Sequence, residues 1–226
     1  MPELLLLIPG AIFPVFLVIS ERKKAMKAAL LFKTLSSAVF VLLGFLMARQ
    51  NEDPAFTRLI LIGLALGMAG DVLLNLRHLL HDNMAVFFLG GGCFFAGHIL
   101  YLAALTGRLS NTPGFLIAAF CTAPFASAAV IIPLLRRIKA GKGFSFVCAC
   151  YIAAVVTMAV TAVFRFIAAP SDRGALLFMI GAVFFAASDT LLFANMPEGA
   201  WKAWRANALI TLYYGGQLLI AISLGF

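Results

Sequence analysis

Eight long apolar runs divide the chain, and short polar connectors separate them. The runs are continuous and lack the alternation of apolar and polar residues that marks the strands of a membrane barrel, so they predict helices. A helix needs about 20 apolar residues to cross a hydrocarbon core roughly 30 Å thick. We therefore predict an all-α, polytopic membrane bundle with eight transmembrane helices. Their predicted bounds are 4–19, 26–48, 56–76, 84–106, 114–135, 144–167, 174–194 and 207–226.

The composition strengthens the membrane prediction. Hydrophobic residues make up 63% of the 226 residues and charged residues only 12%, whereas a soluble domain is about half apolar and about a quarter charged. No connector is long enough to form a soluble domain, so residues 1–226 are predicted to be a single integral membrane domain. We expect the first run to be retained rather than cleaved as a signal peptide, because Glu3 stands where a basic segment would be needed.

The net charge of +8 is unevenly distributed over the connectors. Eleven Lys and Arg residues lie on one side of the predicted bundle and five on the other, and the richer side is expected to be cytoplasmic. Both termini would then lie outside, most simply in a bacterial inner (plasma) membrane. This topological origin accounts for the basic excess, so no nucleic-acid partner is predicted.

Two aspartates occupy look-alike settings inside apolar runs. Asp71 stands in Gly-Asp-Val-Leu-Leu-Asn and Asp189 in Ser-Asp-Thr-Leu-Leu-Phe. An ionised carboxylate at mid-bilayer costs roughly 3 kcal/mol or more, so such acids usually face a partner or a wet cavity. The two lie four spans apart, which suggests a parallel repeat of four plus four helices. Chance resemblance between Leu-rich helices remains an alternative.

Counting along the helices places several polar groups in one layer. With a rise of about 1.5 Å per residue, Asp71 and Asp189 lie roughly 8 Å inside the cytoplasmic boundary, Lys33 roughly 10 Å, and Tyr213 and Tyr214 about 9–11 Å. The predicted polar site therefore contains both acids. For Lys33, snorkelling to the interface is an equal alternative. The acids themselves could be polar glue between helices.

Other polar residues are expected to support this layer. Asn75 follows Asp71 by one turn and is predicted to orient it. His98 lies deeper, with Tyr101 on the same helix face, and either transfers protons or is an ordinary core histidine. Gln217 shares a helical stripe with Tyr213 or Tyr214. No metal site is predicted: the connector residues His78, His81 and Asp82 and the four cysteines have ordinary explanations as surface and core residues.

Taken in order, four short motifs resemble the YhhN family, from about the second predicted helix to the last. They are Gly70-Asp71 with Leu73-Leu74, Gly97-His98-x-x-Tyr101, Ser188-Asp189-x-Leu191-Leu192 and Tyr213-Tyr214-x-x-Gln217.

This resemblance implies an eight-helix membrane protein. Members with an assigned activity are lysoplasmalogenases, which cleave the vinyl-ether bond of an alkenyl-glycerophosphocholine or -ethanolamine to a fatty aldehyde and a glycerophospho head group. The resemblance assigns Asp71 and Asp189 as the acids and His98 and Tyr101 as the histidine motif. Lys33 matches a lysine that proline often follows in the family, whereas Thr34 follows it here.

The expected chemistry is aspartate acid/base catalysis on a lysophospholipid, with no metal or organic cofactor. One carboxylic acid would protonate the vinyl ether, and the other, ionised, would stabilise the resulting cation and activate water. We expect the two carboxyls to lie close enough to share one proton. The residues predicted to bind substrate or support the acids are Lys33, Asn75, His98, Tyr101, Ser188, Tyr213, Tyr214 and Gln217.

Three other functions fit the same residues. A small proton-coupled transporter would use intramembrane acids in a repeated fold. A non-catalytic lysolipid-binding protein would retain the fold without turnover. An intramembrane aspartyl protease is disfavoured, because Met68 stands where the Gly-x-Gly-Asp signature has its first glycine. The sequence alone predicts no oligomeric state.

Overall fold

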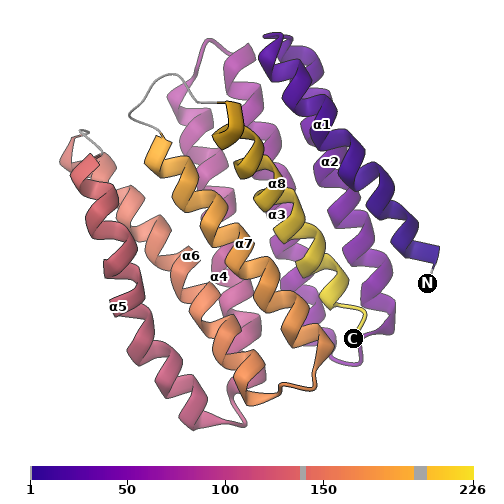
Figure 1. Cartoon of the computed structure of the whole chain (residues 1–226), viewed down its shortest axis with the longest axis vertical. Coiled ribbons are helices and arrows are strands. Elements are labelled where there is room, and N and C mark those ends of the chain that lie inside the picture. Colours follow the sequence, from indigo (N-terminus) through magenta and orange to yellow (C-terminus); the bar gives the residue numbers. More distant parts are fainter. Residues whose placement is uncertain (1, 138–140, 196–202) are drawn as a thin grey trace.

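The computed structural model describes residues 2–137, 141–195 and 203–226, and these residues form helices joined by short turns (Figure 1). All eight long helices are long and apolar enough to cross a membrane, as expected for an integral membrane protein. The predicted class, a helical membrane bundle, is therefore confirmed. The elements in chain order are η1 (Pro2–Leu6), α1 (Leu7–Arg22), α2 (Met26–Met47), η2 (Ala48–Gln50), α3 (Pro54–Leu79), α4 (Met84–Leu109), α5 (Pro113–Arg137), α6 (Lys142–Ala168), α7 (Arg173–Asn195) and α8 (Ala203–Ser223).

Sequential helices pack side by side, and two further contacts close the bundle. Helix α2 packs against α8, and α4 packs against α6. Helices α1 and α5 lie at opposite edges of the bundle, and both termini lie at the same end (Figure 1). The two closing contacts are the ones that a four-plus-four repeat requires, since α2 would correspond to α6 and α4 to α8. The repeat itself stays a prediction.

Capping residues in the sequence determine where helices α3 and α4 begin. Asp53 caps α3, because its carboxylate accepts hydrogen bonds from the backbone N–H groups of Ala55 and Phe56, and Pro54 occupies the first helical position. Asn83 caps α4 in the same way. These caps set the start of two helices whose interiors hold Asp71 and His98.

Glycines allow the helices beside the two aspartates to approach closely. A Cβ at Gly63 in α3 would lie 2.3 Å from a ring carbon of Tyr101 in α4. A Cβ at Gly181 in α7 would lie 2.7 Å from the carbonyl oxygen of Gly216 in α8. Small residues at such positions are a common basis of helix association in membranes. Gly63 and Gly181 precede Asp71 and Asp189 by the same number of residues, so both acids stand at the same height above a tight helix contact.

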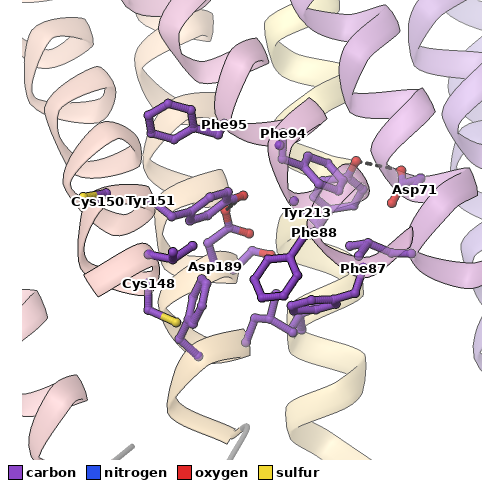
Figure 2. A pocket seen from close by; sticks show the side chains of 18 of the residues that line it. Asp71, Phe87, Phe88, Phe94, Phe95, Cys148, Cys150, Tyr151, Asp189 and Tyr213 are labelled. Atoms are coloured by element: carbon purple, nitrogen blue, oxygen red, sulfur yellow. Dashed lines mark hydrogen bonds between the residues drawn. The ribbon is translucent and has the colours of Figure 1, made fainter. Parts of the chain in front are cut away.

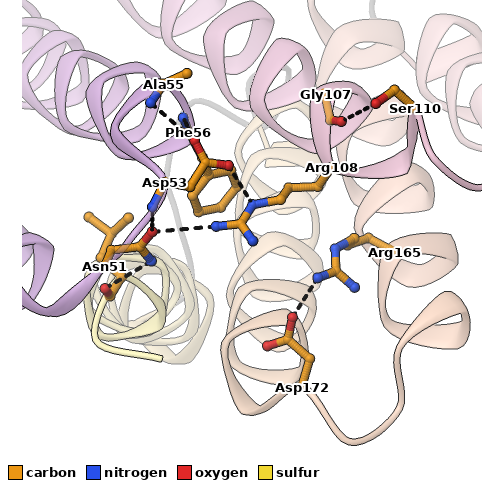
Figure 3. A network of polar contacts seen from close by, with 10 residues as sticks. Asn51, Asp53, Ala55, Phe56, Gly107, Arg108, Ser110, Arg165 and Asp172 are labelled. Atoms are coloured by element: carbon orange, nitrogen blue, oxygen red, sulfur yellow. Dashed lines mark hydrogen bonds and ion pairs between the residues drawn. The ribbon is translucent and has the colours of Figure 1, made fainter.

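A polar network joins helix ends at the end of the bundle that holds the termini (Figure 3). Arg108 of α4 forms an ion pair with Asp53, 3.0 Å between Nε and Oδ2, and its guanidinium lies 4.6 Å above the ring of Phe56. Asn51 donates a hydrogen bond to the carbonyl of Leu224. The network joins the start of α3 to the ends of α4 and α8, and it lies away from the two acids.

Candidate functional site

A cavity of about 400 Å³ lies in the half of the bundle opposite the termini. Its volume is within the usual range for small-molecule sites, about 300–1,000 Å³. Most of its lining is apolar and rich in phenylalanine (Figure 2). The polar side chains of the lining come from helices α2, α3, α6, α7 and α8. Cysteines aside, they are Lys33, Asp71, Tyr151, Ser188, Asp189, Tyr213 and Tyr214.

Asp71 is held by partners from two helices. Its Oδ2 accepts hydrogen bonds from the hydroxyls of Ser37 in α2, at 2.6 Å, and Tyr213 in α8, at 2.7 Å. Lys33 Nζ lies 3.6 Å from Oδ1. Only 2% of Asp71 is exposed, so these contacts replace the water that a buried carboxylate loses. Asp71 is an ion-paired acid.

Asp189 has different partners, also from two helices. Tyr151 of α6 donates its hydroxyl to Oδ2 at 2.7 Å, and His98 Nε2 of α4 lies 3.8 Å from the same oxygen. His98 Nε2 is also 3.3 Å from the Tyr151 hydroxyl. Since the Tyr151 proton points to Asp189, the tyrosine oxygen can accept from His98 when Nε2 carries the hydrogen. The three groups form a chain from His98 through Tyr151 to Asp189.

The two acids thus differ in whether a lysine pairs with them, but their partners come from corresponding helices. Asp71 takes its partners from α2 and α8, and Asp189 takes its partners from α6 and α4. In a four-plus-four repeat, α2 would correspond to α6 and α8 to α4. Within the described ranges, no lysine or arginine forms an ion pair with Asp189, whereas Lys33 pairs with Asp71.

The predicted polar layer agrees with this arrangement in part. Asp71, Asp189, Lys33, Tyr213 and Tyr214 all line one cavity, as the depth count predicts. However, the two carboxyls do not hydrogen-bond to each other and lie on different sides of the cavity, with Tyr213 and Phe94 between them in the view of Figure 2. The expectation of one proton shared directly between them is therefore wrong, because each carboxyl is already held by its own hydroxyl donor.

The supporting residues fall into two groups. Ser188 lines the cavity, as does Tyr214, whose buried hydroxyl has no hydrogen-bond partner in the described structure. Tyr101 and Gln217 are buried behind the cavity, where the tyrosine hydroxyl donates to Gln217 Oε1 at 3.1 Å. Their hydrogen bond links α4 to α8, and neither residue lines the cavity.

Asn75 does not orient Asp71, contrary to the prediction. It is buried, but no hydrogen bond joins the two side chains, and the Asn75 amide oxygen has no partner among the described residues. One helical turn places both residues on a similar face of α3. The oxygens of Asp71 nevertheless point to α2 and α8, so the neighbouring helices supply its partners.

Sequence reasoning missed Ser37 and Tyr151, the hydroxyl donors from α2 and α6. One compositional signal could have revealed Tyr151. The chain has 22 phenylalanines but only four tyrosines, and all four are buried or half-buried around the two acids: Tyr101, Tyr151, Tyr213 and Tyr214. In an apolar interior a tyrosine hydroxyl needs a partner, so a rare tyrosine within a span indicates a polar neighbour.

The remaining histidines lie in the last turn of α3, where His78 stands, and in the α3–α4 connector, which holds His81. His78 Nδ1 lies 2.7 Å from Asp82 Oδ1, which makes a local pair across one turn. Over residues 2–137, 141–195 and 203–226, no group of three or more His, Cys, Asp or Glu side chains is arranged to hold a metal ion.

Comparison with known proteins gives one match. Neither the curated proteins nor the solved structures include a match to this chain. A model of the YhhN family matches residues 28–224, which extend from the first turn of α2 to just beyond α8 and include both acids and every partner described above. The chain therefore belongs to the YhhN family.

Proposed function

We propose that the protein hydrolyses the vinyl-ether bond of a lysoplasmalogen, an alkenyl-glycerophospholipid with one chain. One observation carries the proposal: an apolar cavity within the bundle presents two separately held aspartates, one ion-paired with a lysine and the other without a lysine or arginine partner among the described residues. Vinyl-ether hydrolysis begins with proton donation by an acid, and a nearby ionised carboxylate stabilises the cation that forms. The family resemblance points to the same reaction.

Asp189 is the proton donor in this mechanism. Protonation of the outer vinylic carbon gives an oxocarbenium ion and leaves Asp189 ionised, stabilised by the hydroxyl of Tyr151. No lysine or arginine in the described ranges forms an ion pair with Asp189, so proton loss and return at this carboxyl break no such pair. The chain from His98 through Tyr151 gives a route for the returning proton.

Asp71 is the carboxylate that is charged when the cation forms. Across the cavity it stabilises the cation electrostatically and accepts a proton from the attacking water. The water oxygen bonds to the carbon that carries the ether oxygen and gives a hemiacetal. The hemiacetal hydroxyl then loses its proton to cavity water while the bond between this carbon and the glycerol oxygen breaks and the glycerol oxygen takes up a proton, so the products are a fatty aldehyde and the glycerophospho alcohol. Exchange with cavity water moves the proton from Asp71 back to Asp189. Glycosidases divide work between two carboxyls that do not touch each other in a related way.

Arg77 is suited to hold the phosphate of such a lipid. It lies six residues after Asp71 on α3, hence about 9 Å nearer the helix end. Its guanidinium lies 4.8 Å above the ring of Phe87, a cavity-lining residue, and its buried Nε has no hydrogen-bond partner in the described structure. A guanidinium binds phosphate through paired N–H donors. The phosphate at Arg77 would place the vinyl ether deeper, near the acids.

The test is aldehyde release from a defined lysoplasmalogen by the purified protein, with mass spectrometry of both products. We expect a fatty aldehyde and the glycerophospho alcohol in equal amounts, and no reaction of the saturated alkyl-ether analogue. Asp71→Asn should reduce turnover strongly, whereas Asp82→Asn, the same change at an exposed connector residue, should not. Wild-type protein that releases no aldehyde, or that cleaves the saturated ether equally well, contradicts the proposal.

A further inference from the structure

The wall of the cavity between α4 and α6 is also part of the outer surface of the bundle. Several residues line the cavity and are exposed at the same time. On α4 they are Phe88, Gly92 and Phe95, and on α6 they are Phe146, Val147 and Cys150. A side chain that faces both a cavity and the exterior marks an opening. We call this opening the α4–α6 window and define it by these six residues.

The window opens to hydrocarbon rather than to water. Gly92 is eight residues from the start of α4, or about 12 Å along a spanning helix, so its surroundings are acyl chains. Towards the helix ends, three aromatic rings join α4 to α6: Phe144 lies 6.5 Å from both Phe87 and Phe88, measured between ring centroids. The cavity is therefore narrowed by rings on its interfacial side and open on its lipid side.

The α4 side of the window has free space beside two glycines. A Cβ added at Gly91 or Gly92 would meet no atom within 4 Å. At other glycines of the bundle, such as Gly63, a neighbouring side chain already occupies the space that a Cβ would take. The space beside Gly91 and Gly92 is continuous with the cavity that both line.

The reacting acid lies directly behind the window. Cys150 forms part of the rim, and the next residue, Tyr151, hydrogen-bonds to Asp189 at 2.7 Å. Figure 2 shows Cys150, Tyr151 and Asp189 together on one side of the cavity. A chain that passes through the window therefore leads from hydrocarbon to the carboxyl that, in the proposed mechanism, donates the proton.

We propose that the α4–α6 window admits one hydrocarbon chain of a lipid from the bilayer, so that the substrate is a single-chain amphiphile with its reactive bond inside and its chain end in the membrane. This inference rests on the proposed function for the identity of the reaction. The occupant is a hydrocarbon chain because the rim offers apolar and aromatic side chains, whereas the first polar groups are behind it. A cavity of about 400 Å³ holds a head group and the start of one chain, so the remainder of that chain lies in the window and beyond.

Chain length tests the window through turnover. Gly92→Phe fills the rim, and Gly107→Phe is its control, because Gly107 is an exposed α4 glycine with equally free space near the other end of the helix. Long-chain and short-chain vinyl-ether lysolipids with the same head group serve as substrates. We expect Gly92→Phe to lower kcat/KM for the long chain about tenfold or more relative to the short chain, while Gly107→Phe changes neither. Equal effects on both chain lengths, or no effect, overturn the window.

A second test needs no turnover. The probe is a saturated alkyl-ether lysophosphocholine with a diazirine in the middle of its chain, photolysed with the wild-type protein in nanodiscs. Adducts are expected on the window residues of α4 and α6, and adducts confined to other helices overturn the inference. Window adducts without aldehyde release from a lysoplasmalogen leave the window standing and refute the hydrolase. Aldehyde release without window adducts supports the hydrolase and refutes the window.

Discussion

Replacing Tyr151 by phenylalanine tests the chain of groups that serves Asp189. The change removes one hydroxyl and leaves the ring, which packs 5.5 Å from the ring of Phe193, so the bundle should fold normally. The lost hydroxyl donates to Asp189 at 2.7 Å and lies 3.3 Å from His98 Nε2. Asp189 becomes negatively charged when it gives up its proton in the transition state, so the hydrogen bond strengthens as the reaction proceeds.

The size of the effect follows from the strength of that bond. A hydrogen bond to a charged group contributes about 1.5–3 kcal/mol, and about 1.4 kcal/mol corresponds to a factor of ten in rate. We therefore expect Tyr151→Phe to lower kcat for aldehyde release by about ten- to one-hundredfold. KM should change little, because the hydroxyl acts mainly on charge that develops in the transition state.

Tyr101→Phe is the matched comparison. Tyr101 is also an interior tyrosine, but its hydroxyl donates to Gln217 behind the cavity, so its removal should lower thermal stability more than turnover. Both variants are assayed for aldehyde release and for their thermal unfolding midpoint. Equal losses of kcat in the two variants, or wild-type kcat in Tyr151→Phe, would refute the role given to the hydroxyl chain.

Three further predictions concern charge, recognition and packing. Lys33→Met removes the cation from Asp71 and should lower stability by up to about 3 kcal/mol, reduced by the partial exposure of the lysine; adding Asp71→Asn should restore most of the thermal unfolding midpoint, and no recovery argues against the ion pair. Arg77→Gln should raise KM for a lysoplasmalogen about tenfold or more and leave KM for a phosphate-free alkenylglycerol unchanged, since only the former offers a phosphate to the guanidinium; equal changes argue against a phosphate site. Gly63→Ala should destabilise the fold by about 1–3 kcal/mol, because its Cβ would meet a tyrosine ring. Gly107→Ala should be neutral in the same thermal assay, and two equal midpoints would contradict the close packing.

The sequence predicts the bundle well because the length of an apolar run is a physical requirement of the bilayer. Each predicted span has a corresponding helix, with ends that shift by a few residues, as where α3 covers Pro54–Leu79 instead of 56–76. Polar and charged residues at the helix ends account for much of this difference. His78 and Leu79 continue α3, for example, because a helix can extend beyond the hydrocarbon into the interface.

The sequence predicts how deep the site residues lie in the membrane, but it does not predict how each helix is rotated about its axis. A rise per residue places Asp71, Asp189 and Lys33 in one layer, and all three side chains line one cavity. Which helix faces which carboxyl depends on how each helix is turned about its axis, and a spacing rule within one helix carries no such information. For that reason the spacing wrongly predicts that Asn75 orients Asp71, and it does not identify Tyr151 as the donor to Asp189.

The most direct test of the central claim is the turnover of Asp189→Asn at saturating lysoplasmalogen, with binding of the uncleavable saturated ether measured in the same preparation. The asparagine keeps the size of the side chain and can still accept from Tyr151, but it cannot donate a proton as an acid. Turnover is expected to fall by about 10²–10⁴-fold, while the ether analogue should bind as it does to the wild type. Aldehyde release at the wild-type rate from this variant would contradict the account.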